Sequence, residues 1–176
     1  MDLEDIVSEH AIIPALKADS KKQALQELAA KAAELTGHAI PAREIFDTLL
    51  QRERLGSTGL GRGIAIPHVK FKELDRIHCL FARMQRPIDF EALDDEPVDL
   101  VFLLVAPEHA SGDHLKALAR ISRLLREPDV LQRLRDASSL QDILRVLTEP
   151  ATPHAACPAL PFVSGAHTVE PAVCRH

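Results

Sequence analysis

Hydrophobic positions recur along the first half of the chain with spacings that predict one strand and two helices. A short apolar run at 11–16 is typical of a strand. A helix is expected to begin after Ser20, where Gln23 three positions later gives a capping-box pattern, and to end at Gly37. A second helix is expected to begin at Pro41. Its buried stripe would consist of Ile45, Phe46, Leu49 and Leu50.

The second half begins with strands and closes with helices. Apolar runs predict strands at 64–68, 77–84 and 98–107. The third run is apolar almost throughout, so we expect helices to cover both of its faces. A helix should start at Ser111 with the stripe Leu115, Leu118, Ile121 and Leu125. Shorter helices are expected at about 128–136 and 139–148.

Because helices flank the strands at both ends, the pattern predicts an α/β fold with a central β-sheet packed by helices in a single domain. This domain should span residues 1–150. Residues 151–176 hold four prolines and two formal charges, and no regular period survives the prolines. We therefore expect a flexible Pro-rich C-terminal tail. Its histidines, His154, His167 and His176, are irregularly spaced, which favours a dispensable extension over a metal site.

The composition excludes several classes of function. The 176 residues are 3% aromatic, with neither Trp nor Tyr, and the formal net charge is −5. Stacking platforms and a basic face for nucleic acid are both lacking, so we expect no nucleic-acid partner. No apolar run approaches the length of a membrane span, and the acidic start lacks the pattern of a signal peptide, so we expect a cytoplasmic protein without direct membrane insertion. Cys79, one of three cysteines without metal-type spacing, is expected to be a small buried hydrophobe.

A glycine-rich stretch carries the first candidate for chemistry. Four of the seven glycines lie between Gly56 and Gly63. Such a loop lets backbone amides approach a phosphate, and Ser57 and Thr58 add hydroxyl donors. The spacing G-x-G-x-G matches neither the P-loop nor the dinucleotide-binding fingerprint. On composition alone, a structural turn is as good an interpretation as an anion site.

His68 follows this stretch directly. Pro67 should end the strand at 64–68, because proline donates no hydrogen bond to a sheet, and this places His68 at a strand terminus. A neutral imidazole there can act as a nucleophile. Without the adjoining loop, however, a single histidine is more often structural or simply exposed.

Arg52 and His114 are further candidates, each with a simpler alternative. Arg52 could bring a forked cation to a phosphate, or only compensate the dipole at a helix end. His114 lies at the start of a helix, where free amides favour anions, but it could equally pair with Asp113. His109, Asp113 and His114 together suggest a metal site, yet no known metal signature supports one.

The stretch 52–68 closely resembles the active-site signature of the enzyme IIA domains of the bacterial phosphotransferase system, of the fructose/mannitol type. The match is closest to the nitrogen-related branch, extends to 97–100 and to His114-Leu115, and covers about residues 1–150. It implies a mixed β-sheet sandwiched between helices. The sequence departs from the family at Val69, where Gly is frequent, and at Arg62, where Asn is common.

The resemblance also implies residue roles. His68 corresponds to the phosphorylated histidine, with Nε2 as the expected nucleophile, His114 to a second active-site histidine, and Arg52 to the active-site arginine. The phosphate-binding positions would be Ser57, Thr58, Gly61 and Gly63. The phosphoryl donor would be a histidine phosphocarrier protein. No metal or cofactor is expected, because donor and acceptor are both imidazoles.

Three functions follow, from different classes. The preferred one is a phosphotransferase of the nitrogen-regulatory type, whose phosphorylation state controls target proteins such as potassium transport or sensor proteins. The alternative is a sugar-transport enzyme IIA that passes phosphate to a IIB component, although no IIB-like domain or membrane segment accompanies this chain. The third is an anion-binding regulatory module whose histidine is never phosphorylated.

Overall fold

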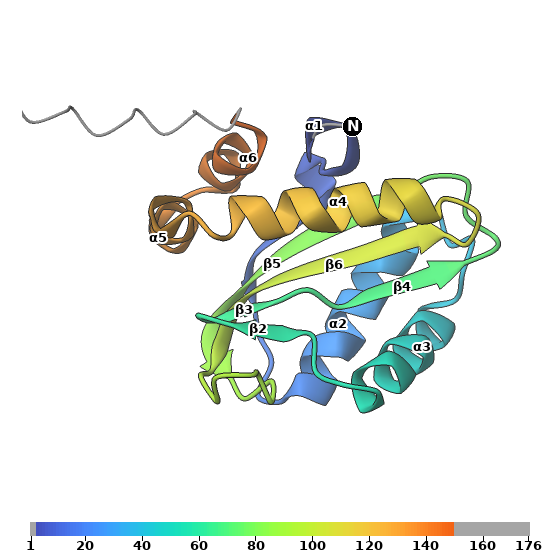
Figure 1. Ribbon diagram of the computed structural model, residues 1–176, viewed down its shortest axis with the longest axis horizontal. Coiled ribbons are helices and arrows are strands. Elements are labelled where there is room, and N and C mark those ends of the chain that lie inside the picture. Colours follow the sequence, from blue (N-terminus) through green and yellow to red (C-terminus); the bar gives the residue numbers. More distant parts are fainter. Residues whose placement is uncertain (1–2, 150–176) are drawn as a thin grey trace, which may run out of the picture.

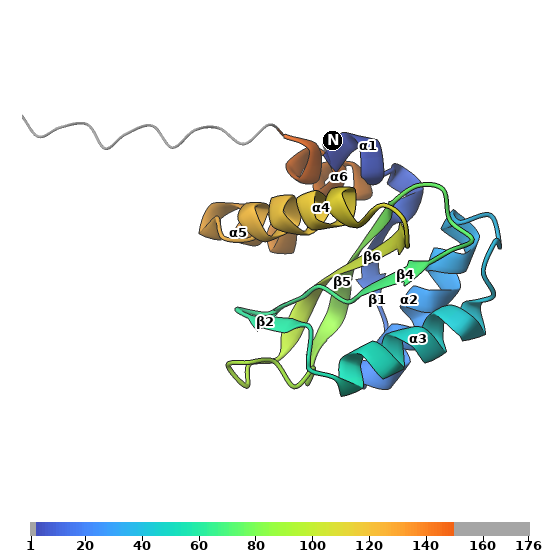
Figure 2. The same ribbon diagram turned by 45° about the vertical axis from the view of Figure 1, so that its right-hand side comes forward.

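The computed structural model describes residues 3–149, which form a β-sheet between two layers of helices (Figure 1). The strands are β1 (Ile12–Leu16), β2 (Gly59–Gly61), β3 (Ile64–Ala65), β4 (His68–Phe71), β5 (His78–Ile88) and β6 (Val98–Pro107). The helices are α1 (Leu3–Ile6), the 3-10 helix η1 (Glu9–Ala11), α2 (Lys21–Leu35), α3 (Ala42–Arg54), α4 (Ser111–Leu124), α5 (Pro128–Asp136) and α6 (Leu140–Thr148). Helices α2 and α3 pack on one face of the sheet, and α1, α4, α5 and α6 pack on the other (Figure 2).

The sheet is mixed. Its strand order is β1-β5-β6-β3-β2, and β4 pairs with β6 beyond the end of β3. β1 is parallel to β5, and β3 and β4 are parallel to β6, whereas β5 is antiparallel to β6 and β2 is antiparallel to β3. The predicted α/β fold, with a mixed sheet flanked by helices on both faces, is therefore confirmed.

Local sequence signals set the boundaries of α2. The Ser20 hydroxyl accepts the backbone N–H of Gln23 at 3.2 Å, and the Gln23 side chain accepts the N–H of Asp19 at 2.9 Å. The first bond satisfies an N–H that a helix start otherwise leaves unpaired, and the second ties the residue before the N-cap to the first turn. Gly37, with φ +63°, follows the end of the helix, as expected for a C-terminal glycine.

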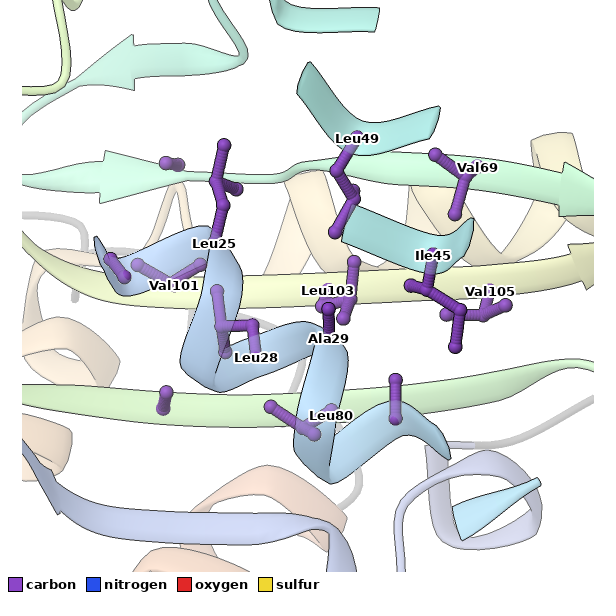
Figure 3. Close-up of a cluster of buried hydrophobic side chains, with 14 of the residues drawn as sticks. Leu25, Leu28, Ala29, Ile45, Leu49, Val69, Leu80, Val101, Leu103 and Val105 are labelled. Carbon is purple, nitrogen blue, oxygen red and sulfur yellow. The ribbon is translucent and has the colours of Figure 1, made fainter. Parts of the chain in front are cut away.

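The hydrophobic core follows the two faces of β6. Val101, Leu103 and Val105 point toward α2 and α3, where Figure 3 shows them beneath Leu25, Leu28, Ala29, Ile45 and Leu49. The alternate residues Leu100, Phe102 and Leu104 point to the opposite helical layer. Because side chains alternate along a strand, a continuous apolar run requires cover on both sides, and this prediction is confirmed. Cys79 is buried as expected, and burial raises the pKa of its thiol to about 12.

The strand expected at 64–68 is divided in two. Pairing breaks at Ile66 and Pro67, as the missing N–H of proline predicts, but the chain then continues along the same edge of β6 as β4. His68 therefore begins a strand, and the prediction that it lies at the end of one was wrong.

Two further expectations need correction. The glycine-rich stretch is not a continuous loop, because Gly59–Gly61 forms β2 and pairs with β3. Leu115, expected in the buried stripe of α4, is 66% exposed, because the helix turns Ala117 and Ile121 toward the sheet instead. Among residues 3–149, no helix is long and apolar enough to cross a membrane. The expected tail at 151–176 lies outside the described residues.

Candidate functional site

His68 presents one defined nitrogen to its surroundings. It begins β4 opposite Leu104, and its side chain lies on the face covered by α4, because the next residue, Val69, points into the core beneath α2 and α3. Nδ1 lies 3.0 Å from the carbonyl oxygen of Ile66. A carbonyl can only accept a hydrogen bond, so Nδ1 carries the proton of the neutral ring. Nε2 is then left with its lone pair, as a nucleophile requires.

His114 lies directly beside His68. The two ring centroids are 5.6 Å apart, with the rings edge to face at 72°. His114 is 3% exposed, and burial, together with the charges of Lys70 and His68, lowers its pKa to about 4. It is therefore neutral at pH 7. Within residues 3–149, its buried Nδ1 has no hydrogen-bond partner.

A relay of hydrogen bonds connects the end of α3 to His68. The buried carboxylate of Glu53 accepts the backbone N–H of Thr58 at 3.2 Å and also accepts the Thr58 hydroxyl. The carbonyl of Thr58 accepts the N–H of Ile66 at 3.0 Å, and the carbonyl of Ile66 holds Nδ1 of His68. These bonds hold the loop after α3 next to Ile66 and Pro67, the two residues that separate β3 from β4.

Lys21 balances the buried charge of Glu53. Its ammonium lies 2.9 Å from Glu53 and 3.0 Å from Glu91. Burial alone would lower the pKa of Lys21, but its hydrogen bonds to the two carboxylates raise it above the usual value. Glu53 was not among the candidates from the sequence. Its position gives a signal in retrospect, because an acidic residue in the last turn of a helix opposes the helix dipole and needs a specific partner.

The expected phosphate-binding hydroxyls are turned to backbone and carboxylate partners. Ser57 donates to the carbonyl of Phe90 at 2.8 Å and accepts the N–H of Gly59 at 3.1 Å. The Thr58 hydroxyl donates to Glu53. Both residues lie on the loop beside the strand break, but each hydroxyl proton is already used. Their contact with a phosphoryl group stays a prediction.

Arg52 lies in the last turn of α3, at the start of the same loop. Its guanidinium donates to the carbonyl of Gly56 at 3.1 Å. Within the described part of the chain, no hydrogen bond or ion pair joins it to His68 or His114. The structure thus brings the two histidines together and leaves Arg52 in the last turn of α3, with donors still available for an anion. Its role as the active-site arginine stays a prediction.

Gly61 and Gly63 flank the turn between β2 and β3, away from His68. The carbonyl of Gly63 accepts the N–H groups of Asp99 and Leu100. His68 pairs with Leu104, four positions later along β6, or about 13 Å. A Cβ on Gly61 would lie 2.8 Å from Asp94, so close packing explains this glycine. A phosphate-binding role for the two residues stays a prediction that their position does not favour.

Gly63→Ala should lower the free energy of unfolding by roughly 2 kcal/mol, because φ is +80° and the added Cβ would lie 2.5 Å from Asp99 and 2.6 Å from Arg135. Urea denaturation measures this change. Gly112→Ala is the control, since nothing lies within 4 Å of the added atom in α4. Equal stability of the two variants would contradict the packing role of Gly63.

Of the two departures from the family pattern, neither faces His68. Val69 is buried in the core beneath α2 and α3. Arg62 occupies the turn after β2 with φ +58°, donates its backbone N–H to Asp94 at 2.8 Å, and donates its side chain to the carbonyl of Arg126 at 3.2 Å. The suggested cluster of His109, Asp113 and His114 does not assemble, and no group of three or more such side chains in residues 3–149 could hold a metal ion.

The depressed pKa of His114 makes stability depend on pH. In the unfolded chain this imidazole takes up a proton as the pH falls through about 6.5, whereas in the folded protein it does so only near pH 4. Between these values the unfolded state binds more protons, so stability falls as the pH is lowered. Wild-type protein should lose up to about 3 kcal/mol more than His114→Leu between pH 7 and pH 4. Denaturation curves of both proteins at pH 7 and at pH 4 measure the difference. An equal loss of free energy of unfolding in the two proteins would contradict the lowered pKa of His114.

Comparison with known proteins relates this geometry to a family. The family model described as "Phosphoenolpyruvate-dependent sugar phosphotransferase system, EIIA 2" matches residues 5–149. A "Nitrogen regulatory protein" from Bradyrhizobium diazoefficiens is 60% identical over 150 residues, which are 85% of this chain and 97% of that protein. A protein of the same name from Klebsiella oxytoca is 34% identical over 151 residues, 85% of this chain and 91% of that one. The crystal structure of "Nitrogen Regulatory Protein IIA-Ntr" from Neisseria meningitidis is 31% identical, with a TM-score of 0.77 over 82% of this chain and 97% of that chain.

These matches agree with the sequence and with the fold. The family model spans the described sheet and its helices almost completely, and it includes the stretch 52–68 on which the resemblance rests. The resemblance is therefore confirmed. The chain belongs to the EIIA 2 family of the phosphoenolpyruvate-dependent sugar phosphotransferase system.

Proposed function

We propose that this protein is a phosphohistidine relay of the nitrogen-regulatory type, which accepts a phosphoryl group on Nε2 of His68 and controls target proteins through its phosphorylation state. One observation carries the proposal. The bond from Nδ1 of His68 to the Ile66 carbonyl leaves Nε2 unprotonated, beside the neutral, buried His114. Family membership supports phosphotransfer as the reaction class.

The transfer needs no external acid or base. Nε2 of His68 donates its lone pair to phosphorus while the bond between phosphorus and the donor imidazole breaks, and the electron pair of that bond returns to the donor nitrogen. His68 keeps its proton on Nδ1, stabilised by the Ile66 carbonyl as the ring becomes cationic. A donor phosphohistidine that carries a proton on its other nitrogen leaves as a neutral imidazole. Protons and charge therefore balance between the two rings.

Catalysis then consists of positioning and charge stabilisation. The transferred group has a loose transition state, with negative charge on the phosphoryl oxygens. His114 donates from its Nε2–H, because its low pKa keeps the ring neutral and its Nδ1 is buried without a partner. Arg52 adds its remaining guanidinium donors from the last turn of α3, directly before the loop that the hydrogen bonds of Glu53 hold in place.

The donor that fits this chemistry is a histidine phosphocarrier protein. The names of the relatives from Bradyrhizobium and Klebsiella support regulation, rather than sugar uptake, as the purpose of the phosphorylated form. In that role the protein has to dock with its donor only briefly, because a relay must release its partner after transfer. We also place the protein in the cytoplasm, where such a carrier would reach it.

Incubation with phosphorylated carrier protein, followed by mass spectrometry at alkaline pH, tests the proposal. We expect one phosphate per chain, retained on His68 when a sugar-system IIB component is added. Rapid and complete passage of the phosphate to the IIB component would favour sugar transport instead. If no phosphate is incorporated, the phosphoryl relay is wrong and the result agrees with an anion-binding module.

A further inference from the structure

Lys70 is a cation beside the candidate site that the candidates from the sequence did not include. It lies two residues after His68 on β4, so both side chains project from the same face of the sheet. Its ammonium nitrogen is 3.4 Å from the hydroxyl of Ser111, the first residue of α4. Figure 1 shows that α4 runs alongside β6 and that its first turn lies near the ends of β4 and β6.

This position is electrostatically unfavourable for a cation in the absence of an anion. The start of α4 carries partial positive charge, since its first N–H groups have no partner within the helix. Asp113 in the same turn lies 3.6 Å from Lys116, and no carboxylate in residues 3–149 forms an ion pair with Lys70. An ammonium and the positive end of a helix thus lie together beside the two imidazoles, and among residues 3–149 the ammonium has no carboxylate within ion-pair distance.

The charge of Lys70 also reaches His114. It contributes, after burial, to the lowered pKa of that ring. His114 is almost fully buried, and its Nδ1 has no hydrogen-bond partner among the described residues. The Lys70 ammonium and the His114 imidazole therefore both lie close to His68. A dianion placed there would attract the Lys70 ammonium and could accept a hydrogen bond from the neutral imidazole.

We propose that Lys70 binds the phosphoryl group carried by His68 and determines how strongly the protein retains it. The proposal rests on the relay function and deepens it. Arg52 lies in the last turn of α3, whereas Lys70 lies on the strand that carries His68, so the two cations would hold different oxygens of the group. Lysine suits this position because its compact ammonium is carried on a flexible side chain, which can adjust as the phosphoryl group is bound and released. Retention matters for a regulator, since its signal lasts only as long as the phosphate stays bound.

The test compares Lys70→Ala, Lys70→Arg and Lys72→Ala. Lys72 is also exposed and lies just beyond β4. Lys72→Ala therefore removes the same charge as Lys70→Ala but leaves the site unchanged. Each protein is mixed with phosphorylated carrier protein, and the distribution of phosphate between the two proteins is measured at equilibrium. Lys70→Ala should shift this distribution toward the carrier by about tenfold, while Lys70→Arg stays near wild type and Lys72→Ala is unchanged.

Phosphorus NMR supplies a readout that a merely structural lysine would not change. Removing the ammonium should raise the pKa of the phosphoryl group in Lys70→Ala and leave it unchanged in Lys72→Ala. If Lys70→Ala retains both the wild-type distribution and the wild-type phosphoryl pKa, while wild-type protein is phosphorylated on His68, the role of Lys70 is wrong and the relay stands. If wild-type protein takes up no phosphate, the relay itself fails.

Discussion

His68→Ala should abolish the uptake of phosphate from phosphorylated carrier protein. The substitution removes Nε2 of His68, the nitrogen that the bond from Nδ1 to the Ile66 carbonyl leaves with a free lone pair, whereas the neighbouring His114 is buried. A nucleophile cannot be replaced by stronger binding of the phosphoryl group, so we expect a loss of at least about 10³-fold in transfer rate. Acid-labile phosphate per chain, measured after incubation with the donor, gives the result directly.

The matched control is His109→Ala, which removes an exposed histidine from the loop before α4. This variant should accept phosphate at the wild-type rate. His68→Gln adds a second comparison, since the amide keeps polar bulk at the start of β4 without an imidazole nucleophile. Stoichiometric phosphate on His68→Ala, with the fold intact, would assign the reaction to another residue.

Glu53→Ala should lower the free energy of unfolding by about 4 kcal/mol, more than any other substitution proposed here. The reason is that it removes a buried carboxylate that several neighbouring groups use as their partner. Lys21 would lose its closest carboxylate, and the N–H and hydroxyl of Thr58 would lose their acceptor. The loop between α3 and β2 would also lose its anchor next to His68. We therefore expect slower phosphoryl transfer even at temperatures where the variant is fully folded. Denaturation curves and single-turnover transfer rates measure the two effects separately.

Asp47→Ala is the control, because it removes an exposed carboxylate from the same helix. It should change the free energy of unfolding by no more than about 0.5 kcal/mol. Glu53→Gln keeps an acceptor for Thr58 but removes the closer of the two carboxylates that pair with Lys21, so its stability should lie between those of wild type and Glu53→Ala. A wild-type transfer rate in folded Glu53→Ala would show that the relay of hydrogen bonds does not position the site.

The apolar periodicity predicted the fold well because burial controls it directly. β6 is apolar on both faces since helices cover both, and this pattern is visible in ten consecutive residues. The division of the strand at 64–68 was not visible. Pro67 breaks the pairing, but the edge of β6 continues beyond this point and the chain pairs with it again from His68. That edge belongs to residues more than thirty positions away, so local pattern carries no sign of it.

The glycine-rich stretch shows a second limit of local reasoning. Gly61 and Gly63 have the composition of a phosphate-binding loop, yet their missing side chains make room for Asp94 and for the ion pair of Asp99 with Arg135. These contacts come from distant parts of the chain. His68 and His114, by contrast, were identified from the sequence and do meet. Lys70 was missed because only the position of α4 shows that its charge lies at a helix start.

Phosphorus–nitrogen coupling in phosphorylated wild-type protein, labelled with nitrogen-15 in its histidines, tests the proposed chemistry most directly. The bond from Nδ1 of His68 to the Ile66 carbonyl requires the phosphorus to be attached to Nε2 of that ring, with the Nδ1 proton retained. We expect a single coupled nitrogen, assigned to Nε2 of His68. Coupling to Nδ1 of His68, or to either nitrogen of His114, would contradict the fixed tautomer and the relay that follows from it.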